Sequence, residues 1–277
     1  MSGEIFHHQH SHAVSSKRFP RWLLIVASIP FLAFLTVPLI ALILHTSMSH
    51  LLDSFFEPHV AEAIVLSIST TLVTTVLAVI FGTPVAYLLA RYQFWGRSFV
   101  DTIADLPMVL PPAVAGVALL MAFGRQGIFG SLLQNLGIRI AFTQVAVVLA
   151  QLFVSSPFYI KSAVQGFAGI DREIEHAAAM DGASAFHIFR NVTIPLALPS
   201  LFSGVLMTWA RALGEFGATI IFAGNFPGRT QTMPLAIYIG FEIDFSVALT
   251  LAVVLLAISF AIIFLLKKIL HDRMFLV

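Results

Sequence analysis

The stretch DREIEHAAAMDGASAFHIFRNVTIPLALP, residues 171–199, is the only long polar run between two apolar spans. Asp171 is a typical helix N-cap, and Glu173 and Glu175 would lie near the positive end of the helix dipole. Three alanines follow, and Gly182 is a typical residue just past a helix end. The pattern predicts a short helix that stops at Gly182.

A second short helix is predicted to begin at Ser184, present Phe186 and Phe189 three residues apart, and end before Pro195. Two short helices hinged at a glycine on a membrane surface are typical of a docking element. A membrane protein that keeps such an element between two spans is expected to be driven by a partner protein.

Composition predicts an all-α polytopic membrane protein. The chain has 277 residues, of which 58% are hydrophobic and 10% charged, and its mean hydropathy is +0.94. A soluble domain cannot bury that much apolar surface. The formal net charge of +1 gives no indication of a nucleic-acid partner, and the absence of cysteine excludes disulfides and thiol chemistry.

Hydropathy predicts six transmembrane helices, at residues 22–44, 63–89, 105–123, 141–159, 198–222 and 245–266. They form a single predicted domain, 21–277, with a loop at 165–195. Residues 1–20 are a polar tail with histidines at positions 7, 8, 10 and 12. No carboxylate or cysteine completes a defined metal geometry there, so we predict a simple tail and no metal site.

Two spans carry unusual residues. The span 63–89 is rich in serine and threonine, which let membrane helices approach closely, so we expect it to lie inside a bundle. The span 105–123 contains Pro107, Pro111 and Pro112 and cannot be regular before Pro112. It is either a segment that lines a pathway or a bent helix start at the interface.

The distribution of basic residues predicts the orientation. With the N-terminus in the cytoplasm, eleven lysines and arginines fall in inner segments, and the outer loops hold only Arg125, Arg139 and Arg229. The positive-inside rule therefore places both termini and the loop 165–195 in the cytoplasm.

The polar stretch resembles the EAA loop of ABC importer permeases, the binding-protein-dependent type I importers. The matching positions are Glu175, Ala177, Ala178, Asp181, Gly182, Ala183, Ile194 and Pro195. His176 stands where many members have Ala, Glu or Gln. In that family the loop forms coupling helices that insert into a cytoplasmic ATPase, and its acidic residue pairs with a basic group there. The resemblance therefore implies ATPase coupling by these positions and by Phe186.

Further segments resemble the permeases for molybdate, tungstate and sulfate. Residues 81–91 and 105–107 fit this group, as do residues 209–218, and the run Asn225-Phe226-Pro227-Gly228-Arg229-Thr230-Gln231-Thr232 is most similar to molybdate permeases. The resemblance implies a type I importer permease in the bacterial inner membrane, transporting a tetrahedral oxyanion, with molybdate as the first candidate. Sulfate, thiosulfate and tungstate are the alternatives.

The same resemblance implies the partners. We expect a homodimer in the bilayer, two cytoplasmic ABC ATPase subunits and an extracytoplasmic oxyanion-binding protein. ATP and Mg would be bound by the ATPase, and this chain would hold no cofactor. The expected contacts for the binding protein lie in the outer loop, at Asn225, Gly228, Thr230 and Gln231.

Arg211 and Glu215 are ionisable residues inside a predicted span, where charges are costly and usually functional. They are four residues apart and can pair on one helical face. One hypothesis is that they line or gate the outer part of the oxyanion path. The other is a salt bridge that locks helices together at the subunit interface.

The sequence predicts no catalytic residue. It lacks the G-x-x-x-x-G-K-[ST] loop that cradles nucleotide phosphates, so this chain is not expected to hydrolyse ATP itself. An ion-coupled secondary transporter or a channel is a further alternative. It would need coupling-ion ligands at the midplane or an inverted repeat, and the sequence offers neither.

Overall fold

The computed structural model describes residues 21–46, 55 and 57–274, and all regular secondary structure in these residues is helical. The chain divides into two compact units, 1–45 and 46–277. In the first, the described element is α1 (Arg21–His45), a helix of 25 residues that contains Pro30 and Pro38 and covers the predicted span 22–44. The predicted histidine-rich tail, 1–20, lies outside the described residues.

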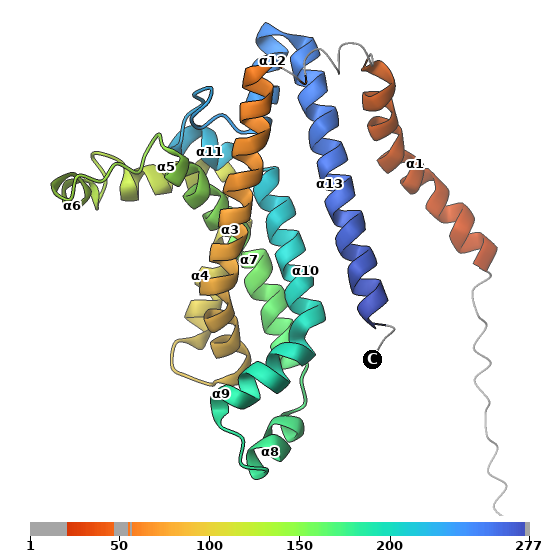
Figure 1. Cartoon of the computed structure of the whole chain (residues 1–277), viewed down its shortest axis with the longest axis vertical. Helices are drawn as coiled ribbons and strands as arrows, with labels where there is room; N and C mark the ends of the chain where they lie inside the picture. Colours follow the sequence, from red (N-terminus) through yellow and green to blue (C-terminus); the bar gives the residue numbers. More distant parts are fainter. Residues whose placement is uncertain (1–20, 47–54, 56, 275–277) are drawn as a thin grey trace, which may run out of the picture. The chain divides into compact units, whose positions relative to one another are not determined.

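Four long helices form the second unit: α3 (Pro58–Arg91), α7 (Gln144–Ala168), α10 (Ile194–Leu213) and α13 (Phe245–Met274). Figure 1 shows α3, α7 and α10 side by side, with α8 (Arg172–Met180) and α9 (Ala185–Ile188) at one end. The short helices α6 (Gly130–Asn135), α11 (Gly217–Phe222) and α12 (Met233–Ile243) lie toward the other end. Loop 165–195 and the loop 224–232 before α12 are therefore at opposite ends of this unit.

The predicted span 105–123 is two helices, α4 (Arg97–Val109) and α5 (Pro112–Phe123), bent by 117°. The break lies at Leu110 and Pro111, whose backbone is extended, because a residue before proline disfavours the helical conformation. Within the described residues, five helices are long and apolar enough to cross a membrane, or six if this bent pair counts as one span.

The predicted span 198–222 is also interrupted. Helix α10 ends at Leu213, and α11 begins only at Gly217, so a single continuous helix through residue 222 was the wrong expectation. The helix α12, between the last two predicted spans, was not anticipated either, since it is too short to give a membrane-span signal.

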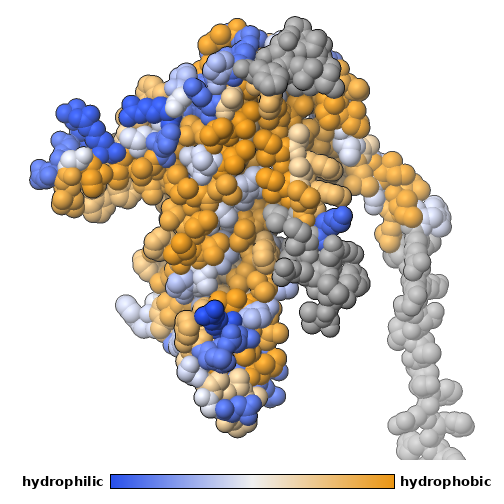
Figure 2. Space-filling model, viewed as in Figure 1, coloured by the Kyte–Doolittle hydropathy of each residue, from blue (hydrophilic) through white to orange (hydrophobic). Residues whose placement is uncertain are grey.

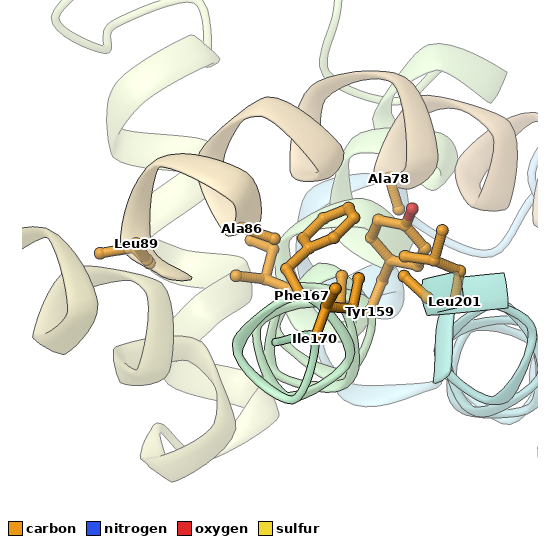
Figure 3. Packing of buried hydrophobic residues seen from close by; sticks show 10 residues of the cluster. Ala78, Ala86, Leu89, Tyr159, Phe167, Ile170 and Leu201 are labelled. Carbon is orange, nitrogen blue, oxygen red and sulfur yellow. The ribbon is translucent and has the colours of Figure 1, made fainter. Parts of the chain in front are cut away.

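Buried side chains from α3, α7 and α10 form the core nearest to α8 and α9. Figure 3 shows Phe167 and Tyr159 of α7 packed between Ala86 of α3 and Leu201 of α10. The Tyr159 hydroxyl is hydrogen-bonded to Thr83 at 2.6 Å. A buried aromatic with a satisfied polar end fixes the relative positions of the helices around it.

The hydroxyl-bearing face of α3 is buried as predicted, but its opposite face carries exposed apolar side chains such as Val65 and Phe81. Within α3, five serines and threonines are buried, namely Ser67, Thr70, Thr71, Thr74 and Thr75. Most bond carbonyls one turn earlier in α3, whereas Thr74 donates to Gln151 of α7 at 3.1 Å. Small side chains that satisfy their own hydroxyls allow this helix to lie inside the bundle. Apolar side chains cover much of the flank seen in Figure 2.

Close approach of α7 and α10 depends on Gly166. A Cβ at Gly166 would lie 2.6 Å from the Cβ of Ser200, so we expect Gly166→Ala to destabilise the protein by about 1–3 kcal/mol through overpacking. Gly169→Ala is the matched control, because its Cβ would meet only the Gln165 and Gly166 carbonyls, at 3.3 and 3.7 Å. When thermal unfolding is measured in detergent, Gly166→Ala alone should have a lower unfolding midpoint than the unmodified protein. Equal midpoints for the two variants would contradict the packing argument.

Candidate functional site

The two short helices predicted within residues 171–199 are present after the end of α7, as α8 and α9. Asp171 is the N-cap of α8, and its carboxylate accepts a hydrogen bond from the Glu173 backbone N–H at 3.0 Å. The chain then reverses at Gly182, whose φ of +86° favours glycine. Ser184 caps α9 by accepting from the His187 N–H at 3.3 Å. The cap at Asp171, the helix start at Ser184 and the stop at Gly182 were predicted from local sequence and are confirmed.

The predicted end of the second helix before Pro195 is wrong. Helix α9 continues through η1 (Phe189–Thr193), a π-helical segment, directly into α10, so that residues 185–213 form one helical run. Pro195 lies in the first turn of α10. The wider π turn before it accommodates the missing N–H of the proline.

Glu175 faces the chain itself. Its Oε1 lies 3.0 Å from Nη2 of Arg91, at the C-terminal end of α3, and accepts a hydrogen bond from the Thr193 hydroxyl at 2.7 Å. Exposure is 7% for the Arg91 side chain and 16% for that of Glu175. One carboxylate therefore joins α3, α8 and η1.

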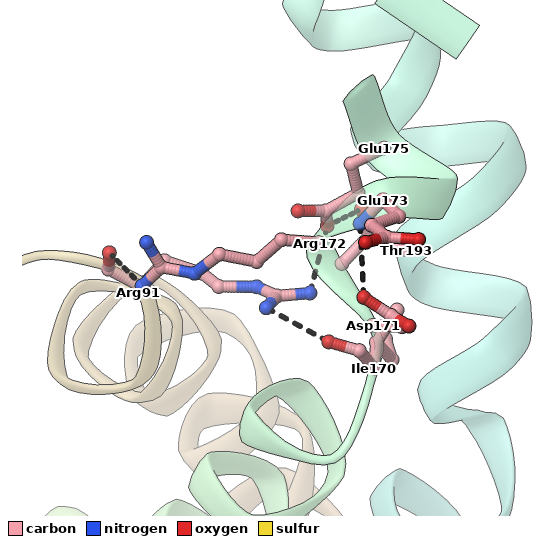
Figure 4. Close-up of polar contacts among 7 residues, drawn as sticks. All are labelled: Arg91, Ile170, Asp171, Arg172, Glu173, Glu175 and Thr193. Carbon is pink, nitrogen blue, oxygen red and sulfur yellow. Dashed lines mark hydrogen bonds and ion pairs between the residues drawn. The ribbon is translucent and has the colours of Figure 1, made fainter. Parts of the chain in front are cut away.

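Two backbone contacts complete this attachment. Arg91 Nη1 donates to the Ile170 carbonyl at 3.1 Å, and Arg172 Nη2 donates to the Arg91 carbonyl at 3.2 Å. Figure 4 shows the two arginines reaching across between α3 and the start of α8. We call the set Arg91, Arg172, Glu175 and Thr193 the loop anchor. It fixes α8 to the end of α3.

The face of the same loop that points away from α3 is exposed to solvent. Helix α8 has no buried residue, and the Met180 and Phe186 side chains are 85% and 70% exposed. The other predicted coupling residues divide into exposed positions and partly buried ones. Ala177, Asp181, Gly182 and Pro195 are exposed, and Ala178 and Ala183 are partly buried. Large exposed apolar side chains beside polar ones are typical of a protein-docking surface.

Arg91 and Thr193 were not among the predicted site residues. Their partner Glu175 is 84 positions from Arg91 and 18 from Thr193, so no local pattern connects them. The one available signal for Arg91 was its position as an arginine at the end of a span. That position is equally typical of an arginine that only marks the membrane interface.

Arg211 and Glu215 form the predicted ion pair, with Nη1 and Oε2 2.7 Å apart. Glu215 is not on the helix, however, but in the break between α10 and α11. Its Oε1 accepts from the Ala218 N–H at 2.9 Å, in the first turn of α11. The Glu215 side chain is 1% exposed and that of Arg211 29%. The pair therefore joins the two halves of an interrupted span.

The predicted binding-protein contacts lie in the turn before α12. Thr230 and Gln231 are buried, and the Thr230 hydroxyl accepts from the Phe226 N–H at 3.1 Å, so both residues shape the loop from inside. Gly228, with φ of +69°, is exposed at the turn. Asn225 is partly buried and donates to the Leu235 carbonyl at 3.5 Å. Of the four predicted contacts, Gly228 is the one fully at the surface.

Comparison with known sequences gives three findings. Residues 82–275 match the family described as binding-protein-dependent transport system inner membrane component. The chain is similar to the molybdenum transport system permease protein ModB of Mycobacterium tuberculosis, at 42% identity over 223 residues, which cover 79% of this chain and 83% of that protein. It is also similar to the probable sulfate transport system permease protein cysT of Chlorella vulgaris, at 36% identity over 201 residues, covering 73% and 76%.

Among solved structures, a chain of the bacterial alginate ABC transporter, in complex with an alginate pentasaccharide-bound periplasmic protein, has a similar fold. The TM-score is 0.66 at 17% identity, covering 89% of this chain and 93% of that one.

Proposed function

The chain belongs to the family of binding-protein-dependent transport system inner membrane components, and from this membership we propose that it is the permease subunit of an ATP-driven importer for a tetrahedral oxyanion. It is a multi-pass inner-membrane protein with the all-α fold of ABC importer permeases. The single observation that carries the mechanism concerns the loop between α7 and α10. One face of this loop is exposed to solvent, and the other is attached to α3 by the loop anchor.

The mechanism follows from that loop. An ATPase subunit, holding ATP and Mg, docks on the exposed face around Phe186. Its closure moves α8 and α9 together. The loop anchor passes the movement of α8 to α3, and the continuous helical run passes the movement of α9 along α10 toward Arg211. Differential binding of nucleotide to the two states supplies the energy that rocks the helices.

The proposed cargo is molybdate. The similarity to a molybdenum permease at 42% identity supports it, as does the run from Asn225 to Thr232. Sulfate is the second candidate, since a probable sulfate permease is similar at 36% identity. Both are tetrahedral dianions, and a cation such as Arg211 serves either.

The proposed assembly has two copies of this chain, two ATPases and one extracytoplasmic binding protein. The termini and the α8–α9 loop face the cytoplasm, as the basic residues predict. The alginate transporter has a similar fold and was solved with its periplasmic protein, which supports a binding protein of this kind. The pair at Arg211 and Glu215 lies at the outer end of α10 in this orientation.

Measuring ATP hydrolysis in lipid nanodiscs tests the proposal. The purified chain alone is expected to show none. With its ATPase and binding protein, hydrolysis should rise when the binding protein carries molybdate, and rise less with sulfate. Phe186→Asp should abolish assembly, because a charge replaces an exposed apolar anchor. Failure to bind any ATPase, or an ion-driven flux without one, would overturn the proposal.

A further inference from the structure

A pocket of about 610 Å3 lies beside α6. Helix α6 lies at the end of the second unit away from α8 (Figure 1). It is formed by the chain on both sides of α6 and by the turn before α12. Leu133, Ile138 and Phe142 give it apolar walls, and Arg125, Arg139 and Arg229 line it with positive charge. Figure 2 shows strongly hydrophilic side chains gathered above an apolar surface in the region of α6.

The three arginines have no acidic partner in the part of the chain that the structure describes. All three side chains are exposed, and the ion pairs found among the described residues involve other groups. Glu62, whose carboxylate lies against Gly228, makes no ion pair with Arg229. Like charges at one pocket without a counter-ion repel each other, so the pocket favours an incoming anion.

These arginines are also the three basic residues that the topology assigns to the outer loops. Lysine and arginine are depleted from extracytoplasmic loops, where they oppose the preferred orientation. Here they come from three separate segments and converge on one pocket. Arginines that each served only as a separate anchor at the membrane interface would not be expected to line one pocket.

The volume and the walls decide which anion the pocket fits. A five-atom oxyanion would fill a small part of about 610 Å3, and the apolar walls would offer it no hydrogen bonds. A protein segment that carries carboxylates and an apolar side chain uses both features, since guanidinium groups bind carboxylates in bidentate fashion and arginine is enriched at protein interfaces. We propose that this pocket receives an acidic segment of the extracytoplasmic binding protein.

The proposal rests on the proposed function, and it moves the main contact from the buried part of the turn before α12 to the arginine pocket. Arg229 belongs to both regions. Binding there would also involve the connection between α5 and α6. Within α5, Gly116 packs against the backbone of α11, close to the break at Glu215. A partner docked in the pocket thus contacts the chain that directly follows α5.

Affinity for the binding protein tests the pocket. The assembled transporter in nanodiscs is titrated with molybdate-loaded binding protein at two salt concentrations. Each single change, Arg125→Glu, Arg139→Glu or Arg229→Glu, should weaken binding by about 3- to 10-fold, and the triple variant by about 100-fold or more with a smaller salt dependence. Lys267→Glu, the same charge change on an exposed residue at the far end of α13, should leave the affinity unchanged.

A photo-crosslinking residue in place of Leu133 identifies the occupant. Crosslinks to an acidic segment of the binding protein support the proposal; crosslinks to a second copy of this chain overturn it. Unchanged affinity in the triple variant also overturns it, as does loss of free-molybdate binding with binding-protein affinity intact. Basal ATP hydrolysis without binding protein should stay normal in every variant. If even the unmodified assembly fails to bind an ATPase or a binding protein, the proposed function fails first.

Discussion

Replacing Glu175 with alanine is expected to uncouple ATP hydrolysis from transport. The change leaves the nearly buried guanidinium of Arg91 without its counter-ion and removes the acceptor of the Thr193 hydroxyl. Breaking a buried pair from one side costs about 3–5 kcal/mol. Arg91 keeps its hydrogen bond to Ile170, so we expect a cost at the lower end of this range, about 3 kcal/mol. That cost corresponds to roughly a hundredfold shift in the equilibrium from the attached to the released loop.

Two measurements check this result. Amide hydrogen exchange across residues 171–182 should become faster in Glu175→Ala, and stimulation of hydrolysis by loaded binding protein should be lost. Glu173→Ala is the matched control: it removes a carboxylate from the same turn of α8, but the Glu173 side chain is exposed. Its exchange and its stimulated hydrolysis should match the unmodified protein.

The double variant Arg91→Met/Glu175→Met separates two roles of Glu175. If Glu175 anchors the loop to α3, removing both charges should recover much of the attachment, since a buried pair replaced by apolar residues is often nearly neutral. If Glu175 instead pairs with a basic group of the ATPase, as the EAA resemblance implies, Arg91→Met alone should leave coupling intact. That outcome would remove the anchor from the mechanism.

The parts of this structure that sequence could predict are those decided locally. Asp171 caps α8 because its side chain reaches a backbone N–H two residues on. The chain reverses at Gly182 because glycine tolerates the positive φ that the turn requires. The burial of one face of α3 followed from its threonines, which satisfy their hydroxyls within the same helix. In each case the cause and the effect lie within about one helical turn.

The parts that sequence reasoning missed depend on residues far apart. Pro195 was expected to end a helix, but a π-helical turn before it keeps the run continuous. The break after Leu213 is held by Glu215 capping α11, a contact that becomes visible only once the chain has turned. The pocket beside α6 gathers three arginines from three segments, which the topology count treated as unrelated.

Removing one charge of the Arg211–Glu215 pair is expected to have the second large effect. Arg211→Ala leaves the Glu215 carboxylate, 1% exposed, without its counter-ion, at a cost of about 3–5 kcal/mol. Glu215→Gln should be milder, because an amide oxygen can still accept from the Ala218 N–H and keep the start of α11 in place. Thermal unfolding should therefore rank Arg211→Ala well below Glu215→Gln.

The neutral double variant Arg211→Gln/Glu215→Gln then distinguishes the two hypotheses for this pair. If the pair only locks α10 to α11, removing both charges relieves the unpaired carboxylate, and stability and molybdate uptake should recover together. If Arg211 contributes a cation to the oxyanion path, stability should recover while uptake stays low or the preference between molybdate and sulfate changes. Uptake by proteoliposomes measured beside the unfolding midpoint gives both quantities. Intact uptake and ion preference in Arg211→Ala and Glu215→Ala alike would exclude a role in the pathway, since neither charge would then be needed where the anion passes.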